Sequence, residues 1–293
     1  MTITSPCTGV CKLDDTTAWC LGCGRSDDEI ADWRMRSDAS RDAVWAEIPD
    51  RLSQLGVECR RLAWSTEDIR DFAVTTLKEG RGTWVMGVVG AVAEMTAATG
   101  EDVDVELEGD DVTARTRNGA IRMTINDDVR ALTFDPPAIG APRIMLAVKR
   151  ERGRLPDKDV VTDLGEDTGA LLGGDGSRQF DFGLGRKEAR FTVRVGDTPV
   201  REALQSSCGV TFADAMPKVG GAVLADSPTR VIETALGRVE VQGQIPPPGG
   251  VSPDGPHTHL LPDHLATGRA TPVGMDLPRA YLPGAIFYPP RQS

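Results

Sequence analysis

The chain has 293 residues, 40% of them hydrophobic and 26% charged, which is typical of a soluble protein with one large domain or two smaller ones. Its formal net charge of −11 argues against binding to nucleic acid or to an anionic membrane, because both repel an acidic surface. The N-terminus lacks the basic and apolar segments of a secretory signal, and the longest apolar run, 84–98, is too short to span a bilayer. We therefore expect a cytoplasmic protein.

Four of the six cysteines lie close together near the N-terminus, in the pattern C-x3-C-x8-C-x2-C: Cys7, Cys11, Cys20 and Cys23. Thiolates are the ligands that zinc and iron–sulfur centres prefer, and two pairs on short loops can bring four sulfurs to one tetrahedral point. Gly22 and Gly24 flank Cys23 and permit the backbone turns that direct N–H groups toward sulfur. The spacing predicts a four-cysteine metal site, the alternatives being two disulfides or four free thiols.

Residues 5–52 resemble a short bacterial four-cysteine domain of unknown function that is described as a predicted Fe–S protein. The matching segments are SPCTGVCKLDD, WCLGCGRSDDEIADW and SDASRDAVWAEIPDRL, and the four cysteines occupy the family's four cysteine positions. The resemblance implies an iron–sulfur cluster. The residues by themselves leave zinc and iron–sulfur both open.

Two short helices are predicted within this module, which we place at residues 1–56. Ser26 and Glu29 have the spacing of a capping box, and a second helix is predicted to begin at Ser37 and to present apolar residues as far as Leu52. Because two short helices enclose only a small core, we expect the metal to help hold the module together.

Residues 65–245 are predicted to form an α+β domain. A helix beginning after Ser65 precedes short strands with alternating apolar residues, at 103–107, 112–117, 120–125, 129–134 and 144–149. Asn118-Gly119 predicts a hairpin with a type I′ turn. A second group of strands is predicted at 180–184, 191–195, 230–234 and 239–242, with helices at 200–207 and 212–224. Strands that follow one another without helices favour antiparallel sheets, in a layout similar to that of haem-utilisation carrier proteins at the level of fold alone.

The tail, residues 246–293, holds eleven of the twenty prolines, both tyrosines and all three histidines. Its many aliphatic residues are unlike those of a disordered linker, so we expect an extended segment that wraps over the α+β domain. The sequences GPHTHLLP and GAIFYPP resemble the C-terminal region of an uncharacterised bacterial family that spans the chain from about residue 66 onward. That resemblance implies a domain boundary and no activity.

The three histidines, His257, His259 and His264, lie within eight residues of one another. His257 and His259 alternate and can share one face of an extended segment, and His264 could supply a third ligand to a zinc or iron site. The alternatives are a haem ligand, a general base, or imidazoles that hydrogen-bond to the backbone and fix the tail in place.

Two classes of function follow. The first is a metal-binding accessory protein, in which a cysteine-ligated module for electron transfer or protein docking is attached to a larger domain. The second is a metalloenzyme or haem-binding protein with its site at the histidines. A protein partner is compatible with either class.

Overall fold

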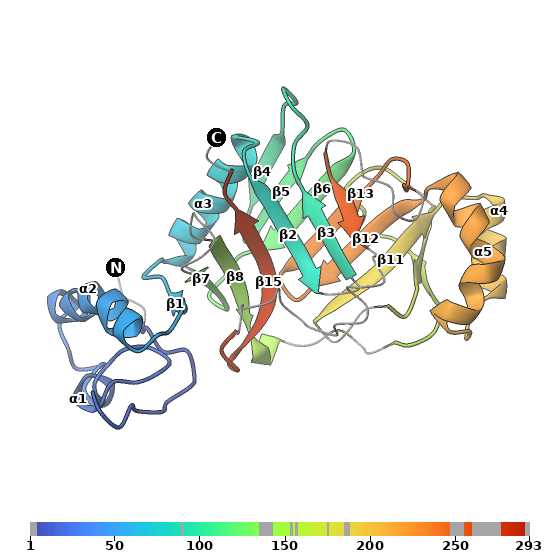
Figure 1. The fold of residues 1–293 in the computed structure, drawn as a ribbon. Coiled ribbons are helices and arrows are strands. Elements are labelled where there is room, and N and C mark those ends of the chain that lie inside the picture. The colour runs from blue at the N-terminus through green and yellow to red at the C-terminus, as the bar shows by residue number, and fades with distance from the viewer. Residues whose placement is uncertain are drawn as a thin grey trace.

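The computed structural model describes residues 5–88, 91–134, 143–152, 155, 158–174, 176–184, 188–246, 255–259 and 277–290. A small helical lobe formed by the N-terminal module lies at one end of a larger body of two antiparallel sheets, as Figure 1 shows. The predicted α+β class is confirmed. No described helix is both long and apolar enough to cross a membrane.

The N-terminal module has two helices, α1 (Asp27–Ala31) and α2 (Asp38–Gln54). The predicted capping box is confirmed, because Ser26 accepts from the backbone N–H of Glu29 and the Glu29 carboxylate accepts from that of Ser26. Ser37 caps α2 in the same way through the N–H of Ser40. The helices enclose a small core of their own: Trp33, Val44, Trp45, Ile48 and Leu52.

The body consists of two sheets stacked face to face. In spatial order, the seven-stranded sheet contains β1 (Cys59–Arg61), β7 (Val129–Phe134), β8 (Arg143–Lys149), β15 (Tyr281–Tyr288), β2 (Thr83–Val88), β3 (Ala91–Met95) and β14 (His257–His259). The eight-stranded sheet contains β4 (Asp104–Glu108), β5 (Asp111–Arg115), β6 (Gly119–Thr124), β13 (Gly237–Val241), β12 (Thr229–Thr234), β11 (Ala189–Val195), β10 (Arg178–Asp181) and β9 (Thr162–Glu166).

One core fills the space between the sheets, with Trp84 and Met86 from β2 and Phe191 from β11 among its buried members. Helix α3 (Thr66–Lys78) adds Ile69 and further apolar residues to this core. Helices α4 (Pro199–Ser206) and α5 (Phe212–Asp226) pack at the end of the body opposite the N-terminal module (Figure 1). A short 3-10 helix, η1 (Arg150–Arg152), follows β8.

The predicted hairpin at Asn118-Gly119 is present, but the predicted turn type is wrong. Strands β5 and β6 pair from Arg115 and Ala120, and the N–H of Thr116 donates to the carbonyl of Gly119 at 2.8 Å. The two central residues are therefore Arg117 and Asn118, and neither has the positive φ that a type I′ turn requires. Gly119 is needed for another reason, because a Cβ there would lie 2.5 Å from Cγ of Pro256.

The described part of the tail joins the seven-stranded sheet. Strand β15 lies between β8 and β2, and a bulge interrupts its pairing with β8 between Pro283 and Ala285. Pro283 has no N–H to donate, and it lies where pairing with β2, which begins at Ala285, is not yet established. The bulge needs Gly284, because a Cβ there would lie 2.6 Å from the carbonyl oxygen of Leu146.

Candidate metal centre

The four N-terminal cysteines lie on two irregular loops that are tied together. The hydroxyl of Thr8 in the first loop donates to the carbonyl of Gly22 in the second at 2.9 Å. The two side chains of the second pair, Cys20 and Cys23, are only 2% and 3% exposed, whereas Cys11 is exposed. None of the cysteines is in a disulfide among the residues that the structure describes.

The second pair lies in a tight backbone turn. The N–H groups of Cys23 and Gly24 both donate to the carbonyl of Cys20, at 3.2 and 2.8 Å, and Gly24 has a φ of +68°. The backbone N–H groups of Gly22, Cys23 and Lys12 lie around Cys20 and help to lower the pKa of its thiol. These donors favour a thiolate over a thiol.

The other sulfurs also receive N–H donors. The backbone N–H of Gly9 lies 3.4 Å from the sulfur of Cys7, and Nε of Arg25 lies 3.4 Å from that of Cys23. N–H groups directed at sulfur are the usual second layer of contacts around cysteine-ligated metals.

The thiols are coupled in pairs. The hydrogen bond between Cys20 and Cys23 lowers the pKa of Cys20 to about 5 and raises that of Cys23, because the pair shares one proton between a thiolate and a thiol. In the first pair, the charge of Cys7 raises the pKa of Cys11, and a thiolate at Cys20 raises it further. Thiolate charge on one cysteine thus opposes ionisation of another, which a bound cation would relieve.

Within the described residues, no three His, Cys, Asp or Glu side chains have the arrangement of a metal site. The metal centre therefore stays a prediction. Two buried guanidinium groups beside the cysteines fit an anionic metal–thiolate centre. Arg25 is 4% exposed and Arg61 6% exposed, and neither is in an ion pair with a described carboxylate.

The cysteine module contacts the body of the protein near the first cysteine pair. The hydroxyl of Tyr281, at the start of β15, donates to the carbonyl of Cys7 at 3.2 Å. Nη1 of Arg61, at the end of β1, donates to the carbonyls of Cys7, at 3.4 Å, and of Ser5. Ala280 lies so close to Gly9 that a Cβ on the glycine would be 2.7 Å from that of Ala280.

Of the three histidines, only His257 has its side chain within the described residues. Strand β14 places His257 opposite Glu94 on β3, with Nε2 3.0 Å from the carboxylate and Nδ1 3.4 Å from the carbonyl of Gly255. Both partners are acceptors, so the imidazolium satisfies them better than a metal-bound imidazole would. The His259 side chain and all of His264 lie outside the described residues, so the histidine site stays a prediction.

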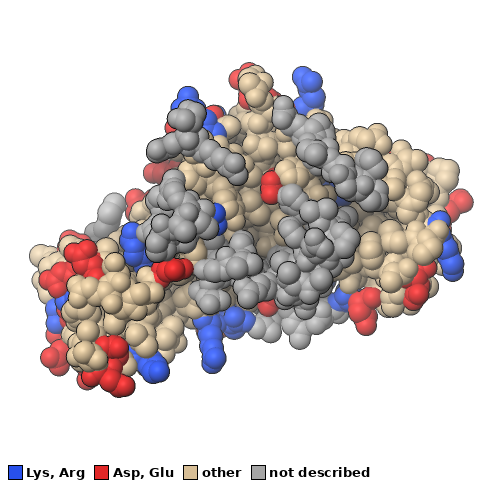
Figure 2. All heavy atoms as spheres, in the orientation of Figure 1, with Lys and Arg blue, Asp and Glu red and all other residues tan. Residues whose placement is uncertain are grey.

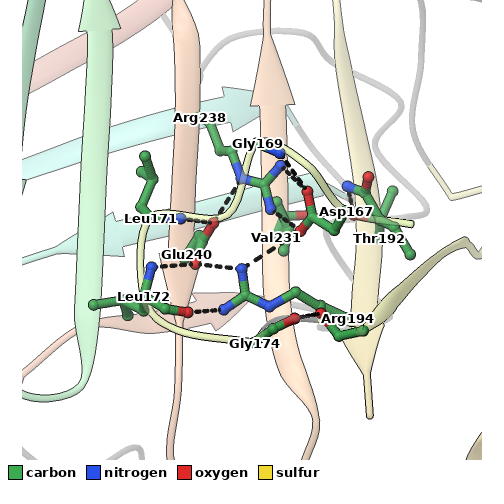
Figure 3. Close-up of polar contacts among 12 residues, drawn as sticks. Asp167, Gly169, Leu171, Leu172, Gly174, Thr192, Arg194, Val231, Arg238 and Glu240 are labelled. Carbon is green, nitrogen blue, oxygen red and sulfur yellow. Dashed lines mark hydrogen bonds and ion pairs between the residues drawn. The ribbon is translucent and has the colours of Figure 1, made fainter. Parts of the chain in front are cut away.

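A buried ion network on the eight-stranded sheet escaped the sequence reasoning. Figure 3 shows Arg238 and Glu240 of β13, Arg194 of β11, and Asp167 at the start of a loop that crosses the sheet. Arg238 donates to Asp167 at 2.9 Å and to Glu240 at 2.8 Å, and Arg194 lies 2.9 Å from Glu240. Glu240, which is 0% exposed, also accepts from the loop N–H groups of Leu171 (2.8 Å) and Leu172 (3.1 Å).

Each charge in this network has a partner of opposite sign, so the network is structural. Burial alone would raise the pKa of Asp167, but the hydrogen bonds and charges of Arg238 and Arg194 outweigh burial and lower it. Asp167 and Glu240 each pair with both arginines, and the partly exposed Glu233 lies 3.2 Å from Arg238 as a third carboxylate. The loop that carries Leu171 and Leu172 thus covers this buried charge and donates hydrogen bonds to it. Alternation of Arg238 and Glu240 with valines along one strand is the signal that could have revealed it.

The two parts of the chain match two family models. Residues 5–52 match a protein of unknown function (DUF1289), and residues 68–292 match a family of unknown function (DUF6925). No curated protein and no solved structure matches the chain. Since the second match covers well over half of the sequence, the protein belongs to the DUF6925 family, and a DUF1289 domain precedes its DUF6925 domain.

Proposed function

We propose that Cys7, Cys11, Cys20 and Cys23 bind one metal centre, zinc or iron–sulfur, and that the DUF1289 module is a metal-binding accessory of the DUF6925 domain. The observation that carries the proposal is the set of N–H donors at the cysteine sulfurs: the N–H of Gly9 lies 3.4 Å from the sulfur of Cys7 and Nε of Arg25 3.4 Å from that of Cys23, and backbone N–H groups lower the pKa of Cys20. An ordinary thiol is a weak acceptor and gains little from such donors, whereas a metal-bound thiolate needs them.

The distribution of charge supports the same proposal. The surface of the module is acidic, with seven Lys and Arg against eleven Asp and Glu in residues 1–60, and Figure 2 shows carboxylates on the lobe at the left. The buried charges at the cysteines are of the opposite sign, namely Arg25 of the module and Arg61 of strand β1. Four thiolates around zinc or an oxidised cluster carry excess negative charge, which these guanidiniums would balance.

The roles of the residues follow from their positions. Cys20 and Cys23 would be the buried, backbone-supported ligands, and Cys7 and Cys11 would close the site from the outer loop. Zinc would supply a structural crosslink, and an iron–sulfur cluster would supply one-electron transfer. Thr8 holds the loops in register through its bond to Gly22.

The test is anaerobic purification of the full chain, followed by a visible spectrum and elemental analysis of the same sample. We expect one centre per chain, with iron, acid-labile sulfide and colour if it is a cluster, or one zinc and no colour otherwise. Cys20→Ser and Cys23→Ser should abolish the signal.

The matched control is Cys208→Ser, because Cys208 is exposed at the end of α4 and far from the module in the fold (Figure 1). It should keep the full metal content. A wild-type protein without metal, prepared both anaerobically and with added zinc, would refute the proposal.

A further inference from the structure

Arg61 belongs to the body of the protein by its backbone and to the cysteine module by its side chain. Strand β1 pairs with β7, with Arg61 opposite Leu132, so the sheet fixes the position of its Cα. The side chain leaves the sheet and donates through Nη1 to the carbonyls of Ser5 and Cys7. It therefore spans the contact between the two domains.

Most of the hydrogen-bonding capacity of this guanidinium is unused. Nε and Nη2 of Arg61 are buried and have no hydrogen-bond partner within the described residues. Carbonyl oxygens satisfy only its third nitrogen, and no described carboxylate pairs with it. Buried N–H donors and a buried charge are both costly unless an anion compensates them.

The surroundings increase that cost. Arg25 and Arg130 both repel the charge on Arg61, whereas Tyr281 and, after it, a thiolate at Cys7 favour that charge. Burial is the main reason why the pKa of Arg61 falls to about 10, which still leaves the side chain charged at neutral pH. Because burial raises the pKa of Tyr281, its phenol is neutral near pH 7, and of these two groups only Cys7 can carry negative charge there.

We infer that Arg61 is the counter-charge of the metal–thiolate centre, so that strand β1, which pairs with β7 of the DUF6925 domain, holds the DUF1289 module electrostatically and holds it best when the metal is bound. This inference rests on the proposed function. In the metal-bound protein Arg61 stabilises the thiolates, and the hydroxyl of Tyr281 fixes the carbonyl of the same ligand residue. In the metal-free protein Arg61 is a buried charge with incomplete compensation.

The decisive experiment compares Arg61→Met with Arg61→Lys in the full chain. The wild type and each variant are loaded with the metal that the wild type binds and are then titrated with a chelator. We expect Arg61→Met to bind that metal roughly 10- to 100-fold more weakly than the wild type, the usual effect of removing an outer partner of a metal ligand. Arg61→Lys keeps the charge without the planar fork and should recover part of the loss.

Thermal unfolding of both forms separates this role from a merely structural one. Arg61→Met should lower the midpoint of the metal-bound protein and leave the metal-free protein at least as stable as the wild type, because it removes an uncompensated charge. A structural role would lower both midpoints alike.

The matched control is Arg150→Met. Arg150 also donates to two backbone carbonyls, those of Arg279 at 2.6 Å and Tyr281 at 3.0 Å, on the same side of β15 but without a contact to the cysteines. It should leave the metal affinity unchanged. If the wild type binds metal and Arg61→Met binds it equally well, the inference is overturned; if the wild type binds none, the proposed function itself has failed.

Discussion

Tyr281 donates its hydroxyl to the backbone carbonyl of Cys7 at 3.2 Å, although 274 positions separate them in the sequence. One residue is the first of the strand β15, in the middle of the seven-stranded sheet, and the other is the first cysteine of the DUF1289 module. The contact shows that the module packs on the DUF6925 domain rather than being merely tethered to it. It also places the C-terminal segment beside the candidate metal centre.

Replacing Tyr281 with phenylalanine should weaken this contact without disturbing the sheet. The ring stays in its apolar surroundings, and the loss is one hydrogen bond, about 1 kcal/mol of the free energy of unfolding. Urea unfolding of the metal-loaded protein measures it. Tyr288→Phe is the control, because Tyr288 contacts the guanidinium of Arg143 through its ring, 4.8 Å from the centroid. Equal stability of wild type and Tyr281→Phe would contradict the prediction.

Glu240→Gln should be among the most destabilising single changes in the body. The substitution removes the charge that two buried arginines share and turns one acceptor of loop N–H groups into a donor. Breaking a buried ion pair from one side costs about 3–5 kcal/mol. Urea unfolding at neutral pH provides the value.

Glu106→Gln is the matched control for that change. The Glu106 carboxylate lies 2.6 Å from Arg115 but its side chain is mostly exposed, so we expect a loss of at most about 1 kcal/mol. If Glu240→Gln and Glu106→Gln lower the free energy of unfolding by similar amounts, the buried network on β13 does not support the loop in the way that its geometry indicates.

The sequence predicted best what is local. The helix caps at Ser26, Ser37 and Ser65 and the hairpin of β5 and β6 depend on neighbouring residues, and all of them are present. Two strands of the seven-stranded sheet are harder to predict. The sequence of β2 and β3 indicates only an apolar run, because both faces of β2 carry apolar residues and the alternation that marks a half-buried strand is absent there.

In the candidate site, too, the residues that lie close together in the sequence can be predicted, and those that the fold brings together cannot. Four cysteines within seventeen residues can be recognised as a ligand set without knowing the fold. Arg61 and Tyr281 cannot, because their approach to Cys7 depends on how β1 and β15 enter the sheet. Nor could Asp167, Arg194 and Glu240, which only the register of distant strands and the path of a loop bring together.

Stability should fall with rising pH through the ion pair of His257 and Glu94. The hydrogen bond that Nε2 of His257 donates to the Glu94 carboxylate, at 3.0 Å, raises the pKa of His257 in the folded protein above the unfolded value of about 6.5. The stabilisation is therefore complete below about pH 6.5 and is lost as the pH rises through the folded pKa. Urea midpoints of the metal-free protein across this range measure it.

The variant His257→Gln keeps a donor toward Glu94 but does not titrate. Its urea midpoint should change less than that of the wild type across the same pH range, so that the two curves converge at high pH. Parallel curves would mean that other groups cause the pH dependence of stability and that protonation of His257 does not contribute to it.

Gly22→Ala should separate the two cysteine pairs. A Cβ at this position would lie 2.4 Å from Oγ1 of Thr8 and 2.6 Å from Cβ of Val10, so the first loop must move away from the second. Because Cys7 and Cys11 are on the loop that moves, the metal content should fall well below one per chain, while the turn from Cys20 to Gly24 keeps its own backbone hydrogen bonds. Gly196→Ala is the control, since a Cβ there meets no atom within 4 Å. Elemental analysis and far-UV circular dichroism on the same samples distinguish loss of the site from loss of the fold. Full metal content in Gly22→Ala would show that Cys7 and Cys11 are not among the ligands.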